Sequence, residues 1–597
     1  MANKFLLGGL SAILVVAVVV GVVATVTRSG TKAGDNFTVP GEATLATSGK
    51  SVKSLCAPTL YKESCEKTLT QAASNGTENP KEVFQAVAKT ALESVKAAYE
   101  RSQTIGNDGK SGGDPMTASA RDDCKKLLDD SVDDLKGMIE MAGGDIKVLL
   151  GRSDDLETWL TGVMTFIDTC ADGFTDEKLK ADMKLVLRNA TELSSNALAI
   201  TNSLGAIFKK LDLDMFKKDS RRRLLSDVDE KGWPVWMKSP ERKLLAAADR
   251  NRPQPNAVVA KDGSGQFKTV QDAVNAMPKG HQGRYVIYVK AGLYDEMVMI
   301  PKDKVNIFMY GDGPKRSRVT GRKSFADGIT TMKTATFCEP HSAGLHAASF
   351  SIYFHHATKS NAHTHASVEA SGFICKNMGF HNTAGAERHQ AVALRVQGDL
   401  AAFFNCRFDA FQDTLYVHAR RQFFRNCVIS GTIDFIFGNS AAVFQNCLII
   451  TRRPMDNQQN SVTAHGRTDP NMKSGLVIQN CRLVPDQKLF PDRFKIPSYL
   501  GRPWKEFSRL VIMESTIADF IKPEGYMPWD RDFALKTLYY AEYNNRGPGA
   551  GTSKRVNWPG FRVIGRQEAE QFTAGPFIDG AQWLRFTGTP HILGFKF

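Results

Sequence analysis

Two aspartates in the second half of the chain have a context that predicts paired carboxylate chemistry. Asp434 precedes the apolar run 435–437, where an isolated carboxylate costs several kcal/mol to bury without a partner. Asp413 and Asp434 each lie seven residues after a cysteine, Cys406 and Cys427. In register on neighbouring strands they would lie about 4.8 Å apart, so one pKa should rise while the other stays low. We therefore expect one acid and one nucleophile or base; two unrelated turn aspartates are the alternative.

A repeat of about twenty residues provides that register. The sequences FFNC, FRNC and FQNC end at Cys406, Cys427 and Cys447, and a fourth copy, IQNC, ends at Cys481. Strand-like runs such as 285–289 alternate with turns rich in Gly, Asp and Asn. A period near twenty with this composition predicts a parallel β-helix, with the asparagines stacked at a turn and the aromatic side chains inside.

The first half of the chain predicts a different fold. Residues 50–215 have apolar residues three and four positions apart, with short Gly-containing breaks, which predicts an up-and-down helical bundle. A basic, Pro-containing linker follows at 216–255. In it, basic residues at 221–223 and 242–243 each precede two leucines. We interpret the linker as a cleavage region for a secretory-pathway protease, with a merely solvated basic linker as the alternative.

The N-terminus indicates the secretory route. Residues 5–26 are apolar or small and uncharged, which is long enough to span a bilayer. Residues 1–30 are therefore expected to be a signal-anchor, which would tether the precursor to the membrane, or a cleaved signal peptide. Three N-glycosylation sequons fit this route. They begin at Asn36, Asn75 and Asn189.

The net charge of +14 is unevenly distributed along the chain. Residues 50–220 contain 23 Lys and Arg against 28 Asp and Glu, so the remainder carries all of the positive excess. A basic second half predicts an anionic partner such as anionic lipid or acidic polysaccharide. Nucleic acid is not expected, because no zinc-finger spacing, RNP-like motif or basic heptad region occurs.

Four segments give the second half a resemblance to a known family. They are QAVALR at 390–395, QDTLY at 412–416, DFIFG at 434–438 and LGRPW at 500–504. In this order they resemble the signature segments of plant pectin methylesterases, and the resemblance covers residues 256–597. Residues 50–215 are similar to the inhibitor-like pro-region of the same family. The resemblance implies a right-handed parallel β-helix preceded by a four-helix bundle, acting on pectin in the cell wall.

The resemblance also implies the chemistry of the site. Asp434 would attack the methyl ester of a galacturonate unit, and Asp413 would protonate the departing methanol and later act as base. Two amides would donate hydrogen bonds to the oxyanion; these belong to Gln390 and Gln412. No metal or cofactor is needed for this reaction.

Three further residues are implied as contacts of the site. Arg502 would hold Asp434 ionised and oriented. Trp504 would pack on a sugar ring, and Thr331 would contact the substrate. A structural ion pair and a core aromatic are the alternative interpretations of Arg502 and Trp504.

Ten cysteines in a secreted chain predict disulfides. The expected bridges are Cys56–Cys65, Cys124–Cys170, Cys406–Cys427 and Cys447–Cys481. The first would close a short hairpin and the second would join two helices. The last two would each cross one turn of the solenoid, and the resemblance favours both.

Residues 338–366 depart from the family pattern. They contain six of the twelve histidines, and the most closely spaced are His355, His356, His363 and His365. Such spacing is compatible with zinc or copper, but the segment has no repeat pattern. We interpret it as a translated intron or an inert surface loop, with a metal site as the alternative, and expect no metal requirement. Its proximity to Thr331 makes that contact less secure.

The function expected from these features is hydrolysis of pectin methyl esters, with the pro-region inhibiting or chaperoning the enzyme before cleavage. A pectin lyase would need a Ca²⁺ site of several acids, and a galacturonan hydrolase would need further paired acids; neither occurs near Asp413 and Asp434. The remaining alternatives are a non-catalytic wall-binding solenoid and an inhibitor of other esterases.

Overall fold

The computed structural model describes residues 49–73, 80–106, 114–143, 151–211, 254–336 and 370–596. Several expectations lie outside these residues. They are the signal segment 1–30, all but the last two residues of the linker 216–255, the sequons at Asn36 and Asn75, and the insert 338–366. Asn189 is described and is exposed on a helix.

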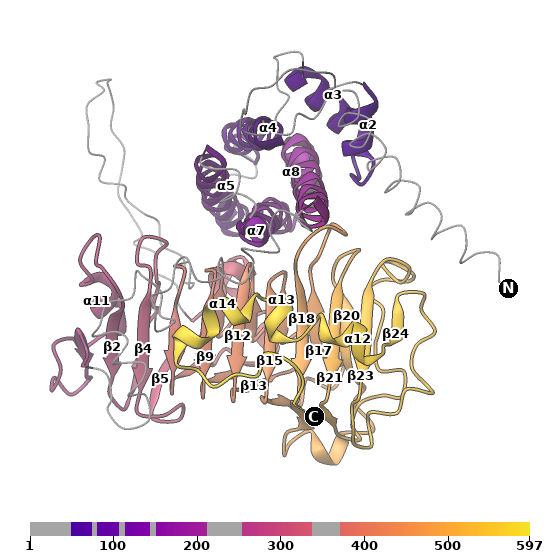
Figure 1. Ribbon diagram of the computed structural model, residues 1–597. Coiled ribbons are helices and arrows are strands. Elements are labelled where there is room, and N and C mark those ends of the chain that lie inside the picture. Colours follow the sequence, from indigo (N-terminus) through magenta and orange to yellow (C-terminus); the bar gives the residue numbers. More distant parts are fainter. Residues whose placement is uncertain are drawn as a thin grey trace, which may run out of the picture.

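The first half is helical, as predicted. Its helices are α2 (Gly49–Cys56), α3 (Lys62–Ala73), α4 (Pro80–Ser102), α5 (Pro115–Gly143), α7 (Ser153–Asp172) and α8 (Glu177–Leu211). Helices α4 and α7 each pack against both α5 and α8, and their apolar faces form one core (Figure 1). Disulfides join Cys56 to Cys65 and Cys124 to Cys170, so both bridges predicted here are confirmed.

The second half forms three parallel sheets that extend along one axis (Figure 1). The eleven-stranded sheet contains β1 (Ala257–Val259), β2 (Tyr285–Val289), β4 (Ile307–Gly311), β6 (Ile374–Lys376), β9 (Ala401–Phe404), β12 (Arg421–Arg425), β15 (Ala441–Gln445), β18 (Gly475–Gln479), β21 (Arg509–Met513), β23 (Tyr539–Tyr543) and β24 (Phe561–Val563). The eight-stranded sheet contains β3 (Gly292–Asp295), β5 (Ser317–Gly321), β7 (Gly379–Asn382), β10 (Arg407–Asp409), β13 (Val428–Gly431), β16 (Leu448–Thr451), β19 (Arg482–Pro485) and β22 (Thr516–Ile517). The five-stranded sheet contains β8 (Leu394–Val396), β11 (Leu415–Val417), β14 (Ile436–Gly438), β17 (Asn460–His465) and β20 (Ser498–Pro503). From β6 to β22, successive strands visit the three sheets in turn, which is a parallel β-helix.

Short helices lie in the connections between the strands of the solenoid and after its last strand. They are α11 (Val270–Asn275), η1 (Phe325–Asp327), η2 (Thr331–Thr334), η3 (Ala386–Arg388), η4 (Phe490–Asp492), α12 (Arg566–Glu570), α13 (Ala574–Phe577), α14 (Gly580–Trp583) and η5 (Leu584–Thr587). Helices α12 to α14 run across the outer face of the large sheet (Figure 1), where Phe577 and Trp583 pack on Phe423 and its neighbours. Among the described residues, no helix has both the length and the apolar character needed to cross a bilayer.

The repeat performs the structural role that its sequence predicted. Asn405, Asn426 and Asn446 have positive φ angles of 53°, 52° and 60°, which asparagine tolerates better than most residues. Nδ2 of Asn446 donates to Oδ1 of Asn426 at 2.6 Å, so neighbouring turns are joined by a ladder of side-chain amides. Inside the solenoid, the ring of Phe424 stacks on Phe403 at 4.9 Å and on Phe444 at 4.8 Å.

The two disulfides predicted within the solenoid are wrong in this structure. All four cysteines are buried and free, as is Cys375; the four are Cys406, Cys427, Cys447 and Cys481. They occupy equivalent positions on successive parallel coils, so their side chains project in the same direction instead of toward one another. A disulfide requires Cβ atoms about 3.8 Å apart, whereas stacked strands hold equivalent positions about 4.8 Å apart. The thiols therefore fill the core between the carbonyls of adjacent turns.

The helical region is docked on the β-helix above its middle coils (Figure 1). Met332, Ala419 and Met472 of the solenoid join the hydrophobic core of the helices. Polar contacts surround them: the Asn439 amide donates to Thr165 on α7 at 2.8 Å, and Ser195 on α8 donates to Asp469 at 2.5 Å. The two halves thus share a packed interface that includes both apolar and polar groups.

Candidate active site

The two predicted acids occupy equivalent positions on adjacent coils. Asp413 lies two residues before β11 and Asp434 two residues before β14, and these strands pair with Leu415 opposite Ile436. Both aspartates have positive φ, 63° and 50°, so each sits in a tight turn at the start of its strand. The predicted register is confirmed, and it places both carboxylates in one pocket.

The surroundings give the two carboxyl groups different properties. Asp413 is 7% exposed, and its burial, together with the neighbouring charge of Asp434, raises its pKa well above the usual range. Asp434 is equally buried but is held by Arg502, whose Nε lies 2.9 Å and 3.1 Å from the two carboxylate oxygens and whose Nη2 lies 2.6 Å from Oδ2. Such bidentate pairing gives short, well-oriented hydrogen bonds. Burial therefore favours a protonated Asp413, beside an Asp434 that the Arg502 guanidinium holds in one orientation.

The two predicted oxyanion donors are also adjacent. Gln390 and Gln412 form a parallel bridge on neighbouring coils, and both line the pocket. Oε1 of Gln390 is buried and finds no hydrogen-bond partner among the described residues. Both side chains are half-buried and line the pocket, so they lie beside the space in which a tetrahedral oxyanion would form.

The pocket has a volume of about 320 Å³, which is in the range of small-molecule sites. The β-helix contributes all seven predicted site residues, namely Thr331, Gln390, Gln412, Asp413, Asp434, Arg502 and Trp504. It also contributes Phe325, Thr330, Met332, Tyr416, Phe437, Ala464 and Trp529. The helical region contributes Asp123, Thr169, Asp172, Gly173 and Thr175. The two halves of the chain thus enclose the pocket between them.

Two tryptophans bound the side of the pocket near Arg502. Trp504 packs at 6.1 Å from the ring of Phe437, and a Cβ at Gly466 would lie only 2.8 Å from the Trp504 ring, so glycine permits the close approach. Trp529, 37% exposed, lies under the Arg502 guanidinium with 4.3 Å between Cζ and the ring centroid. Sequence reasoning missed Trp529. The one sequence feature that could have identified it is the placement of this tryptophan between Pro528 and Asp530, in a loop.

Acidic residues of the helical region meet lysines at the edge of the pocket. Lys505, next to Trp504, pairs with Asp172 at 2.7 Å and with Asp168 at 3.2 Å. On the other side, Thr330 donates a short hydrogen bond to Asp123, and Lys333 lies 3.8 Å from the same carboxylate. Burial raises the pKa of Asp123 to about 6, with Lys333 opposing the rise. Asp123 and Asp172 thus line the pocket from the helical side and form its roof.

Within the described ranges, no group of three or more His, Cys, Asp or Glu side chains converges as metal ligands do. The histidine-rich insert 338–366 lies outside those ranges. The chemistry available to the pocket is that of an acid, a carboxylate nucleophile and amide donors.

Comparison with known proteins agrees with this geometry. The pectinesterase family model matches residues 256–352 and 347–581, and the two matches overlap at residues 347–352, inside the insert 338–366. The family model for plant invertase/pectin methylesterase inhibitors matches residues 50–200.

Relatives of the whole chain and of its second half are known. The probable pectinesterase/pectinesterase inhibitor 13 of Arabidopsis thaliana is 40% identical over 553 residues, covering 91% of this chain and 82% of that protein. Pectinesterase 1 of Citrus sinensis is 40% identical over 584 residues, covering 96% and 92%. The structure of pectin methylesterase from carrot matches with a TM-score of 0.53 and 48% identity, covering 58% of this chain and 100% of that one. This chain is therefore a member of the pectinesterase family with an N-terminal region of the pectin methylesterase inhibitor family.

Proposed function

We propose that this chain removes methyl groups from methyl-esterified galacturonate in pectin, releasing methanol and leaving pectate, during modification of the plant cell wall. The observation that carries the proposal is the buried pair of aspartates on adjacent coils, with Arg502 fixing Asp434 and burial raising the pKa of Asp413. Membership of the pectinesterase family supports it independently.

The mechanism follows from the assignment of one role to each carboxyl group. The Asp434 carboxylate attacks the ester carbonyl, and the tetrahedral oxyanion accepts hydrogen bonds from the amides of Gln390 and Gln412. The C–O bond to the methoxy group then breaks as Asp413 donates its proton, so methanol leaves and an acyl-enzyme remains. Asp413, now ionised, takes a proton from water, which attacks the acyl-enzyme and releases the pectate carboxylate and Asp434.

The other site residues hold the reactants. Arg502 fixes the Asp434 carboxylate in one orientation, and Trp529 covers the face of its guanidinium. We assign Trp504 to stacking against a sugar ring and Thr331, at the start of η2, to a substrate contact; both line the pocket. The basic charge of the second half favours an acidic polysaccharide as substrate.

Methanol release by residues 246–597, compared with residues 50–215, tests the function. Only the esterase assignment predicts release by the second fragment, whereas a non-catalytic solenoid or an inhibitor of other esterases predicts none. In the active fragment, Asp434→Asn should abolish release because an amide is a poor nucleophile. Asp413→Asn should reduce release at least about 100-fold, since general acid catalysis contributes roughly 10²–10⁴. Release above a tenth of wild type by either variant, with the fold intact by circular dichroism, would refute the assignment.

We further propose that the helical region, residues 50–215, is a four-helix pro-region that masks the right-handed β-helix domain, residues 256–597, until the linker is cut. The pocket roof formed by Asp123, Asp172 and their neighbours supports masking. Secretion to the cell wall, membrane tethering by residues 1–30, and glycosylation at Asn36, Asn75 and Asn189 remain part of this proposal, and the exposure of Asn189 is compatible with it.

A further inference from the structure

In the part of the chain that the structure describes, the ion pairs between the two halves have a single polarity. The β-helix supplies the cations, and α5 and α7 of the helical region supply the carboxylates. The cations are Lys302, Lys333, Arg420, Arg421, Lys473 and Lys505. Their partners are Asp122, Asp123, Asp130, Asp133, Asp134, Asp154, Asp155, Asp168 and Asp172. A surface that recognises carboxylates therefore exists on the β-helix.

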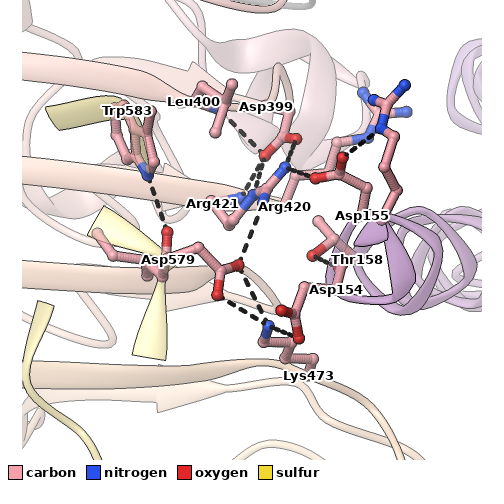
Figure 2. A network of polar contacts seen from close by, with 12 residues as sticks. Asp154, Asp155, Thr158, Asp399, Leu400, Arg420, Arg421, Lys473, Asp579 and Trp583 are labelled. Carbon is pink, nitrogen blue, oxygen red and sulfur yellow. Dashed lines mark hydrogen bonds and ion pairs between the residues drawn. The ribbon is translucent and has the colours of Figure 1, made fainter. Parts of the chain in front are cut away.

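Two of these cations are also neutralised within the β-helix (Figure 2). Arg421 pairs with Asp399 at 2.5 Å and with Asp579 at 3.1 Å, in addition to Asp155 of α7. Lys473 pairs with Asp579 at 3.2 Å, in addition to Asp154. When the helical region is removed, both cations keep carboxylate partners, so they retain little power to attract another anion.

The other four cations depend on the helical region. Every described ion pair of Lys302, Lys333, Arg420 and Lys505 goes to an aspartate of α5 or α7. Three of the four are largely buried by that contact, with side chains 10%, 5% and 15% exposed for Lys333, Arg420 and Lys505. We call these four residues the basic row. Removal of the helical region uncovers the basic row without these ion-pair partners, although the carboxylate of Asp399 still acts on Arg420 from within the β-helix.

The basic row begins at the catalytic pocket and extends away from it. Lys505 follows Trp504 in the chain, and Lys333 lies two residues after Thr331; both of these neighbours line the pocket. Lys302 and Arg420 of the β-helix contact α5 farther from the pocket, where both form ion pairs with Asp134. Asp134 is eleven residues beyond Asp123, which lines the pocket, so the row spans about 16 Å along the helix axis.

We propose that the basic row binds the carboxylates of demethylated galacturonan, and that the aspartates of α5 and α7 occupy these positions in the precursor. This inference rests on the proposed function, because each hydrolysis there converts a neutral ester into a carboxylate that stays on the chain. A product chain that leaves the pocket along the basic row would place its carboxylates next to these cations. These carboxylates would take the positions that the aspartates of α5 and α7 occupy in the precursor. The row would keep the demethylated stretch bound while the next ester enters the pocket.

Binding of a demethylated oligogalacturonate of about ten units to residues 246–597 tests the proposal. The carrot enzyme, which corresponds to this part alone, indicates that such a domain folds without the helical region. The test variant is Lys302→Ala with Arg420→Ala, and Arg420→Lys is the conservative variant. Lys473→Ala is the matched control, since Asp579 already neutralises that lysine. Lys279→Ala, on an exposed site beyond α11, controls for net charge.

The double variant should bind the oligomer about tenfold more weakly at 0.15 M salt, because each solvent-accessible pair contributes up to about fivefold. Arg420→Lys and both controls should change affinity less than twofold. Equal affinity of the double variant and the parent domain would overturn the proposal, as would equally tight binding of polyglutamate of the same charge. Methanol release by the parent domain is measured separately. An inactive domain that still needs Lys302 and Arg420 to bind the oligomer would refute the proposed function and retain the uronate-binding surface.

Discussion

Replacing Asp123 by Asn tests how pH controls the roof of the pocket. Asp123 is 2% exposed, accepts a hydrogen bond from Thr330 and lies near Lys333. Burial raises its pKa from 3.8 to about 6, although Lys333 opposes the rise. On an undocked helical region the carboxyl group would meet water and return to its ordinary value. Docking therefore takes up a proton when the pH lies between the two values.

The direction of the effect follows from that uptake. A carboxyl group whose pKa is raised in the docked state favours docking at low pH, and this contribution is lost as the pH rises through about 6. With pKa values of 3.8 and about 6, the docking constant should fall about tenfold between pH 5 and pH 7, about 1.3 kcal/mol. Asparagine resembles the protonated carboxyl group and can still accept from Thr330, so Asp123→Asn should remove this component.

The assay is methanol release by the full chain divided by release by residues 246–597 at the same pH, which cancels the pH dependence of catalysis itself. The factor by which this ratio rises from pH 5 to pH 7 should be about tenfold smaller for Asp123→Asn than for the wild-type chain. Asp122→Asn is the matched control, because Asp122 pairs with the same Lys333 at 3.1 Å but is 57% exposed. Identical slopes for wild type and Asp123→Asn would show that the buried carboxyl group does not govern docking.

Three further predictions concern other parts of the chain. Cys124→Ser with Cys170→Ser should lower the free energy of unfolding of the helical region by about 4 kcal/mol, since the bridge closes a loop of 46 residues; chemical denaturation measures it, and an unchanged midpoint would contradict it. Alanine at 221–223 and 242–243 should retain an uncut, poorly active precursor inside the cell, and normal export of a protein beginning near residue 246 would refute the processing proposal. Deletion of 338–366 should leave esterase activity equal or higher and remove no stoichiometric metal. Loss of activity on deletion, with zinc-dependent activity only in the intact chain, would establish the insert as a metal site.

The solenoid was predictable because the spacing of the sequence repeat determines the register of its strands. Identical spacing from Cys406 to Asp413 and from Cys427 to Asp434 has one simple consequence in a parallel stack: the two acids become neighbours. The Asn ladder and the Phe stack follow from the same spacing, since each coil places the same residue type over the previous one. Side-chain identity and period together therefore predicted that the two aspartates are neighbours, without any long-range information.

The cysteines and Trp529 show where this reasoning ended. Spacing placed Cys406 and Cys427 at equivalent positions, and side chains at equivalent positions of a parallel stack point the same way, so the two thiols stack without forming a disulfide. Trp529 lies outside the repeat, on a loop that brings its ring against the Arg502 guanidinium. Its position depends on the path of the loop, for which a single sequence has no periodic signal.

The only sequence feature that predicted the position of the helical region was the opposite charge of the two halves of the chain. The net charge of +14, with an acidic stretch at 50–220, predicted that the basic half meets an anionic partner. In the structure the first such partner is the chain's own α5 and α7, and their aspartates meet lysine and arginine beside the pocket. Net charge acts over distances of about a Debye length and cannot select among cations. The selection comes from packing: Phe166 of α7 lies 5.6 Å from His418 and 5.4 Å from the Arg420 guanidinium, which fixes the helix over these coils. Charge therefore attracts the helical region to the basic face, and packing of Phe166, together with the apolar contacts of Met332, Ala419 and Met472, decides that it covers the pocket.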